Sequence, residues 1–187
     1  MIHVGYFSNQ FASSKGHGIA RYAHHLYNAL LQNKASLTLH PVSASTNGTL
    51  EEIEALKSRT SLQVLPWGRK TTPLAWMFFN FPFLENGISN QVDIVHALSL
   101  GYKVATRKPY VVTIHDIGPL THPQFFTKKD QWFMKGSLKQ AVNKGAAMIC
   151  VSQATADAVE AYALANYNQS VKERLHVVHE GVDATFF

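Results

Sequence analysis

A histidine and an aspartate, His115 and Asp116, directly follow a short apolar run at residues 111–114. Such a run is typical of a strand covered on both faces of a parallel sheet, where ionisable side chains are costly to bury for packing alone. The imidazole of His115 could donate a hydrogen bond to a substrate hydroxyl or to a developing charge, and Asp116 could orient the imidazole or a neighbouring backbone group. The alternative is a pair that only ties down its loop. The sequence marks both residues as candidate catalytic groups.

Two glycines, Gly16 and Gly18, open a helix-like stretch after a long loop near the amino terminus, and Arg21 follows them. Glycines let a backbone pass close to a ligand, and the free N–H groups of a helix start can hold a phosphate or hydroxyl oxygen. A dinucleotide fingerprint would need a third glycine where Arg21 stands and an acidic residue ending the second strand. NAD binding is therefore disfavoured. A loop whose glycines merely begin a helix is the alternative.

Ser152 follows a second apolar run and is predicted to cap a helix, with Thr155 in its first turn. A helix start at the carboxyl end of a strand is also where an anionic or sugar ligand meets free N–H groups. No Gly-x-Ser-x-Gly elbow surrounds Ser152, so it is not expected to act as a nucleophile. We expect no metal site, because His115, Asp116 and His122 lack zinc-motif spacing and a cysteine partner. The adjacent pair at 24–25 is predicted to lie on the surface.

The elements that must position these residues alternate along the chain. Strands are predicted at residues 1–7, 37–42, 62–65, 93–98, 110–115, 147–152 and 175–179. Helices are predicted at 19–32 (with Ile19, Tyr22, Leu26, Ala29 and Leu30 on one face), at 49–57 behind a capping box, at 127–144 (with Trp132, Phe133, Leu138 and Val142 inward) and at 152–165. This alternation predicts a single domain over 1–187, with a doubly wound, Rossmann-like, mostly parallel seven-stranded α/β sheet and helices on both faces. Ligands bind such sheets beyond the carboxyl ends of the strands.

The most apolar window, residues 72–84, is too short to cross a membrane. We predict a helix and loop packed on the sheet, since Trp76 and Phe79 share a helical face. The alternative is an interfacial, lipid-facing patch.

The composition excludes several classes of protein. The 187 residues include 17 Lys and Arg against 12 Asp and Glu, which gives a net charge of +5. That excess suits phosphates, nucleotides or an acidic membrane surface, although it could serve solubility alone; no nucleic-acid partner is expected. The lone Cys150 indicates a reducing compartment, and no signal peptide precedes the first strand, so we expect a cytoplasmic protein.

Six segments, in order, resemble group 1 (family 4) glycosyltransferases, which are retaining enzymes of the two-domain GT-B fold. The segments are Gly-x-Gly-Ile-Ala-Arg-Tyr at 16–22, Asp-Ile-Val-His-Ala at 93–97, Val-Val-Thr-Ile-His-Asp at 111–116, His-Pro at 122–123, Val-Ser-Gln-Ala-Thr at 151–155 and Val-Val-His-Glu-Gly-Val-Asp at 177–183. The resemblance runs from Met1 to Phe187 but covers only the amino-terminal half of those enzymes.

The resemblance implies that this domain binds mainly the acceptor, while a carboxy-terminal domain holds the nucleotide-sugar donor. Gly16 and Gly18 would approach the donor diphosphate and the acceptor, His115 would sit beside the transferred sugar, and Ser152 would line the cleft. No divalent metal or other cofactor is implied, because the second domain neutralises the leaving diphosphate. Front-side attack, with a phosphate oxygen taking the acceptor's proton, needs no enzymic nucleophile.

The chain departs from the family pattern in two places. Glu180 stands where the family often has Asn, so we assign it no ligand role. The two donor-domain glutamates eight positions apart are absent, since Glu173 and Glu180 miss that spacing by one. We therefore expect the amino-terminal half of a hexosyltransferase of polysaccharide biosynthesis, acting on a glycan or glycolipid acceptor, possessing its own carboxy-terminal domain elsewhere and inactive alone. A basic face would suit docking on an anionic membrane. The alternatives are a sugar-nucleotide epimerase-like GT-B enzyme and a non-enzymatic module that binds sugars or a partner.

Overall fold

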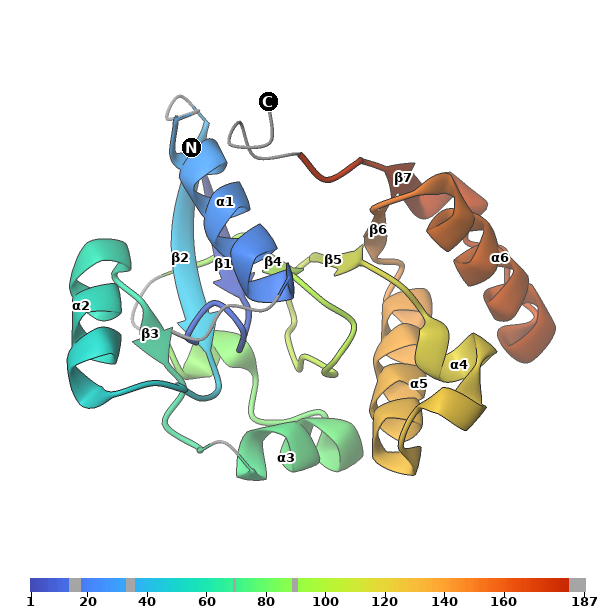
Figure 1. Cartoon of the computed structure of the whole chain (residues 1–187), viewed down its shortest axis with the longest axis horizontal. Helices are drawn as coiled ribbons and strands as arrows, with labels where there is room; N and C mark the ends of the chain where they lie inside the picture. Colours follow the sequence, from blue (N-terminus) through green and yellow to red (C-terminus); the bar gives the residue numbers. More distant parts are fainter. Residues whose placement is uncertain (14–17, 33–35, 69, 89–90, 182–187) are drawn as a thin grey trace.

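The computed structural model describes residues 1–13, 18–32, 36–68, 70–88 and 91–181. Seven parallel strands form one sheet in the order β3-β2-β1-β4-β5-β6-β7 (Figure 1). The strands are β1 (Ile2–Phe7), β2 (Leu37–Ser43), β3 (Gln63–Val64), β4 (Ile94–Ala97), β5 (Tyr110–Ile114), β6 (Ala147–Cys150) and β7 (Leu175–Val177). The α-helices are α1 (Gly18–Gln32), α2 (Leu50–Thr60), α3 (Thr71–Phe79), α4 (Gly118–Thr121), α5 (Lys128–Asn143) and α6 (Gln153–Tyr167), with short 3-10 turns at Leu84–Asn86, Pro123–Phe125 and Lys172–Arg174. The predicted doubly wound, parallel α/β fold is confirmed.

The sheet separates two apolar cores, and successive residues of β1 point into them alternately. Tyr6 faces the core under α1 and α2, where its hydroxyl donates to the carbonyl of Ala23 at 2.7 Å. Phe7 faces the larger core under α3, α5 and α6, and its ring meets that of Trp76 at 5.4 Å between centroids. Both faces of the sheet are thus covered, as the near-continuous apolar runs of the strands require.

The strand order reverses direction between β1 and β4, which are neighbours in the sheet although distant in sequence. The chain passes outward from β1 to β3, returns through α3, and then builds β4 to β7 on the other side. A crevice opens above the carboxyl ends of the strands at such a reversal, because the connections on its two sides diverge.

Helix starts follow the sequence closely. Thr49 and Glu52 form the expected capping box of α2. Thr127 caps α5 through the backbone N–H of Asp130, and Ser152 caps α6 through that of Thr155. These hydroxyl oxygens satisfy N–H groups that the first helical turn leaves without partners.

The buried faces of three helices differ from the predictions. In α1 the buried residues are Ala20, Ala23 and Tyr27, because the helix turns Tyr22 toward the carboxyl edge of the sheet. Phe79 is 78% exposed, since α3 ends there, whereas Trp76 is buried. Trp132 on α5 is 42% exposed beside α3.

The prediction that His24 lies on the surface is wrong. His25 lies on the surface, but His24 is half-buried and its ring stacks on that of Phe11 at 4.4 Å between centroids. This burial lowers the pKa of His24, so it packs against Phe11 as a neutral ring.

The Gln140 side chain joins α5 to the loop before β5 by hydrogen bonds. Its amide accepts from the backbone N–H of Val104 at 2.9 Å, donates to the carbonyl of the same residue at 2.8 Å, and donates to Asn80 at 3.2 Å. Val104 is fully buried, so its backbone groups have no access to water.

Replacing Gln140 with alanine is expected to lower the free energy of unfolding by about 2–4 kcal/mol, because it leaves two buried backbone groups without partners. Urea denaturation measures the change. The matched control is Lys139→Ala at the exposed neighbouring position, which should change stability by less than about 0.5 kcal/mol. Equal effects of the two substitutions would contradict this reading of Gln140.

Candidate active site at the carboxyl edge of the sheet

Three of the residues singled out in the sequence come together where β5 and β6 end. The Ser152 hydroxyl accepts from the backbone N–H of Thr155 at 3.1 Å and lies 3.0 Å from the Thr155 hydroxyl. The Thr155 hydroxyl in turn donates to the carbonyl oxygen of His115 at 3.2 Å. The start of α6 therefore fixes the backbone that carries His115. The role of these residues in ligand binding stays a prediction.

The imidazole of His115 is held at both nitrogens and its side chain is 16% exposed. Its Nε2 donates to the carbonyl oxygen of Leu98, just after β4, at 3.0 Å. Its Nδ1 lies 2.8 Å from a carboxylate oxygen of Glu180, beyond β7. A carbonyl oxygen and a carboxylate oxygen both accept hydrogen bonds, so each ring nitrogen is placed to donate. One ring thus joins segments that follow three different strands.

A row of largely buried polar side chains lies behind the His115 ring. Tyr22 of α1 packs edge-on against His115, with 4.9 Å between centroids and an interplanar angle of 88°. The Tyr22 hydroxyl is 3.4 Å from that of Thr113, which is 2.9 Å from Nε2 of His96. Burial raises the pKa of Tyr22 and lowers that of His96 to about 4, so both are neutral near pH 7. These contacts hold in place the Tyr22 ring against which His115 packs.

Four residues that make these contacts have no site role in the sequence-based prediction. Glu180 received no role, and Tyr22 was placed on a packing face. Thr113 and His96 each interrupt an apolar strand run, and a polar residue there must find a partner. Such a polar residue within an apolar run is the sequence signal for the side-chain contacts that join Tyr22, Thr113 and His96.

Asp116 is exposed and turned toward its own loop. One carboxylate oxygen accepts from the backbone N–H of Gly118 at 2.7 Å, which is the loop-tying role given above as the alternative. Gly118 permits this turn, since a Cβ there would meet that oxygen at 3.0 Å and the Phe126 ring at 2.9 Å. Asp116 also lines the neighbouring cavity.

The glycine segment is described in part. Gly16 lies outside the described residues. Gly18 and Arg21 are exposed in the first turn of α1. Gly18 lies one turn before Tyr22, which contacts His115, and Arg21 directly precedes Tyr22. A Cβ at Gly18 would have nothing within 4 Å, so packing does not require glycine there.

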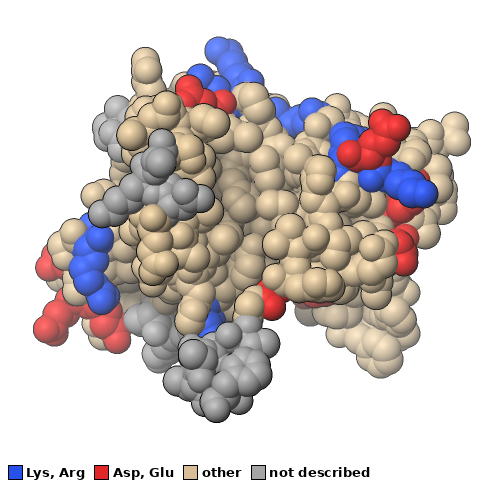
Figure 2. Space-filling model, turned by 90° about the horizontal axis from the view of Figure 1, so that it is seen from above, with Lys and Arg blue, Asp and Glu red and all other residues tan. Residues whose placement is uncertain are grey.

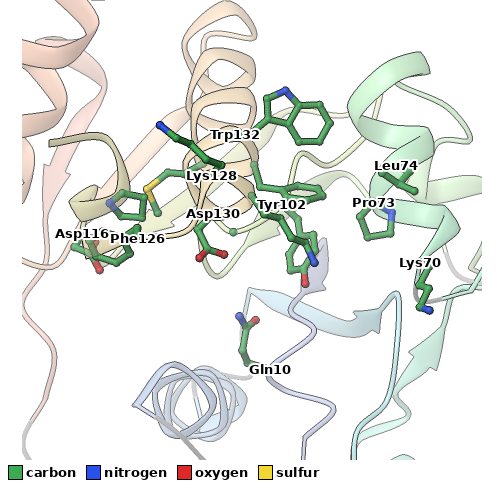
Figure 3. Close-up of a pocket in the computed structure, with 15 residues that line it drawn as sticks. Gln10, Lys70, Pro73, Leu74, Tyr102, Asp116, Phe126, Lys128, Asp130 and Trp132 are labelled. Atoms are coloured by element: carbon green, nitrogen blue, oxygen red, sulfur yellow. The ribbon is translucent and has the colours of Figure 1, made fainter. Parts of the chain in front are cut away.

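A cavity of about 1290 Å³ lies at the point where the strand order reverses (Figure 3). Gln10 follows β1, Tyr102 follows β4 and Asp116 follows β5, so residues from three neighbouring strand ends line the cavity. The opposite walls come from α3 and the start of α5. Their lining residues include the cations Lys70, Lys128 and Lys129 and the rings Phe126, Trp132 and Phe133. Cations and rings in one hollow suit a ligand with anionic and apolar or sugar faces.

The family model for Glycosyltransferase Family 4 matches residues 16–186, nearly the whole chain. The chain belongs to glycosyltransferase family 4. A search of curated proteins finds no match.

Two further observations bear on the chemistry of this family 4 domain. Among the residues that the structure describes, no group of three His, Cys, Asp or Glu side chains is placed to hold a metal ion. Burial raises the pKa of the Cys150 thiol to about 11, so the described cysteine is a neutral core residue rather than a nucleophile.

Glu180 shields Nδ1 of His115 in the family 4 domain, and its removal should expose that nitrogen. Glu180→Ala is expected to speed acylation of His115 by diethyl pyrocarbonate, because an unprotonated, accessible ring nitrogen attacks this reagent. Peptide mass spectrometry gives the rate at each histidine. Exposed His122 should react equally in both proteins, and Glu173→Ala, at another exposed glutamate, should leave His115 unchanged. An unaltered rate at His115 in Glu180→Ala would show that the carboxylate does not cover the ring.

Proposed function

We propose that this domain is the acceptor side of a retaining glycosyltransferase, of the hexosyltransferase type, which transfers a sugar from a nucleotide-sugar donor to a glycan or glycolipid. The observation that carries the proposal is the position of the cavity in a family 4 domain. It lies at the reversal of strand order, where α/β sheets bind ligands, and Asp116 links it to the His115 cluster. The size of the cavity suits one or two sugar rings with an attached group.

The donor would be held by a carboxy-terminal domain of the same protein, facing the carboxyl edge of this sheet. Gly16, Gly18 and Arg21 would approach the donor diphosphate, and so would Ser152 and Thr155 at the start of α6. The N–H groups at helix starts and the cation supply favourable charge for an anionic donor. We expect neither a metal nor another cofactor, and we place the activity in the cytoplasm, in polysaccharide biosynthesis.

In the proposed reaction, the acceptor hydroxyl oxygen forms a bond to the anomeric carbon on the face from which the diphosphate departs. The bond from that carbon to the diphosphate breaks, and a phosphate oxygen takes the hydroxyl proton. His115 would donate Nδ1–H to a hydroxyl of the transferred sugar, while Nε2–H stays on Leu98. The Glu180 carboxylate contacts Nδ1 in the structure, so it must move away before the sugar hydroxyl can accept from that nitrogen.

The test combines this chain with the carboxy-terminal half of a family 4 enzyme and supplies radiolabelled UDP- and GDP-sugars with glycan and lipid extracts of the source cells. Label should enter an acceptor only when both halves are present. Release of free nucleotide without an acceptor would instead indicate elimination chemistry of the epimerase kind. Failure of every pairing and donor would overturn the proposal.

A further inference from the structure

Exposed apolar side chains of α3, of the segment directly after it and of α5 form one surface. We call it the aromatic ridge, and it comprises Leu74, Phe78, Phe79, Phe81 and Trp132, which are 47%, 66%, 78%, 56% and 42% exposed. The Phe78 ring lies 5.5 Å from the Trp132 ring and 6.3 Å from the Phe79 ring, between centroids. Five large apolar side chains gathered in this way are unusual on a domain surface and indicate a binding face.

Cations flank the aromatic ridge. No residue from 71 to 84 is charged, and Lys70 precedes this stretch. Lys103 reaches the end of α3, where its Nζ lies 3.4 Å from the carbonyl oxygen of Met77. Lys128 and Lys129 stand on the first turn of α5 beside Trp132.

The two acidic side chains that line the cavity together with lysines, Asp116 and Asp130, already accept hydrogen bonds. Asp130 accepts from the Thr127 hydroxyl at 2.6 Å, and Asp116 from the backbone of Gly118. The face seen from above shows a different pattern, since acidic and basic side chains are interspersed there (Figure 2). The apolar surface and the cations that flank it therefore favour an anionic partner with an apolar interior.

The aromatic ridge is continuous with the cavity of the candidate site. Leu74 and Trp132 belong to both, and Trp132 projects from α5 toward α3, where Leu74 and Pro73 lie (Figure 3). A ligand could therefore pass from a surface covering the ridge into the cavity without crossing open water.

We infer that the aromatic ridge docks on an anionic lipid bilayer, and that the cavity receives the headgroup of a lipid-linked acceptor from that bilayer. Phenylalanine and tryptophan side chains partition into the boundary between headgroups and acyl chains, and each nearby lysine adds electrostatic attraction to anionic lipid. Lysine is depleted at protein–protein interfaces, whereas lysines flank this ridge. The acceptor part of the inference rests on the proposed function, whereas the docking of the chain does not.

Sedimentation with vesicles tests the docking. The chain should bind vesicles of phosphatidylcholine with phosphatidylglycerol, and bind at least about tenfold more weakly to phosphatidylcholine alone. Phe78→Ser/Phe79→Ser should weaken binding to the anionic vesicles by about tenfold or more. Lys128→Gln/Lys129→Gln should weaken it by about tenfold and remove most of the preference for anionic lipid.

Matched controls separate these effects from general loss of charge or apolar surface. Leu50→Ser/Leu164→Ser removes exposed apolar side chains from α2 and α6, at the two ends of the sheet, and should bind vesicles as the parent does. Lys57→Gln/Lys172→Gln removes two exposed lysines elsewhere and should also bind normally. Brominated phosphatidylglycerol should quench tryptophan emission, and Trp132→Phe should remove most of the quenched part, because Trp76 is buried and Trp67 packs against the core.

Three results would overturn the inference: no binding to anionic vesicles, equal loss in the control variants, or ridge substitutions that disrupt assembly with the carboxy-terminal half while vesicle binding persists. The third result would make the aromatic ridge a domain interface. Sugar transfer to a water-soluble glycan, with no vesicle binding, would refute the docking and leave the proposed function intact. If the chain binds anionic vesicles but transfers no sugar with any carboxy-terminal half, the docking would stand and the proposed function would be refuted.

Discussion

Replacing His115 with alanine is expected to slow sugar transfer by at least about a hundredfold in the two-domain enzyme. The substitution removes the proposed donor to the transferred sugar and leaves the Leu98 carbonyl and the Glu180 carboxylate without their partner. A hydrogen bond that strengthens as charge develops lowers kcat more than it raises KM. Initial rates with radiolabelled donor, at several acceptor concentrations, measure both constants.

The control for this prediction is His122→Ala, which removes an exposed histidine from the same loop. It should retain nearly the full rate. Circular dichroism and urea denaturation should show that His115→Ala remains folded. If the folded variant kept parental kcat, His115 would be a structural residue that joins β4, β5 and the segment after β7.

Acidification between pH 6.5 and pH 4 is expected to lower the free energy of unfolding by about 3 kcal/mol through His96 alone. Burial lowers the pKa of His96 from 6.5 to about 4, so the unfolded chain binds its proton more readily than the folded one. The stabilising contribution is complete above pH 6.5 and is lost as the pH falls to the folded value. Urea denaturation at pH 7, 5.5 and 4 measures the slope.

His96→Gln keeps a partner for Thr113 but removes the titrating ring, so its stability should change much less over the same range. Some slope should remain, because burial also lowers the pKa of His24 and His40. His176→Gln, at an exposed position in β7, should follow the parent curve. If His96→Gln lost as much stability on acidification as the parent, the pKa of His96 in the parent would not be lowered by burial.

The sequence was sufficient for the sheet because its signals are local. The runs at 111–114 and 147–150 are mostly apolar. The capping residues Thr49, Thr127 and Ser152 each lie one residue before the helix that they cap. The alternation of strands and helices, together with right-handed crossovers, leaves few possible arrangements of the sheet.

The site was harder to predict because its contacts join distant segments. Glu180 meets His115 only after β6 and β7 are placed beside β5, and nothing in its neighbourhood in the sequence indicates this. The cavity likewise needs α3 to return beside α5. Periodicity identified an apolar side for α3 but could not show that Phe78 and Phe79 lie beyond the edge of the core.

The central claim is that this domain forms one wall of a crevice, with His115 facing a second, donor-binding wall. Hydrogen–deuterium exchange tests it most directly when the carboxy-terminal half and a nucleotide sugar are added to the chain. We predict slower exchange in residues 115–122 and 151–156, at the ends of β5 and β6, and no change in α2. Protection of α2 or of the amino ends of the strands, with 115–122 unaffected, would contradict the claim.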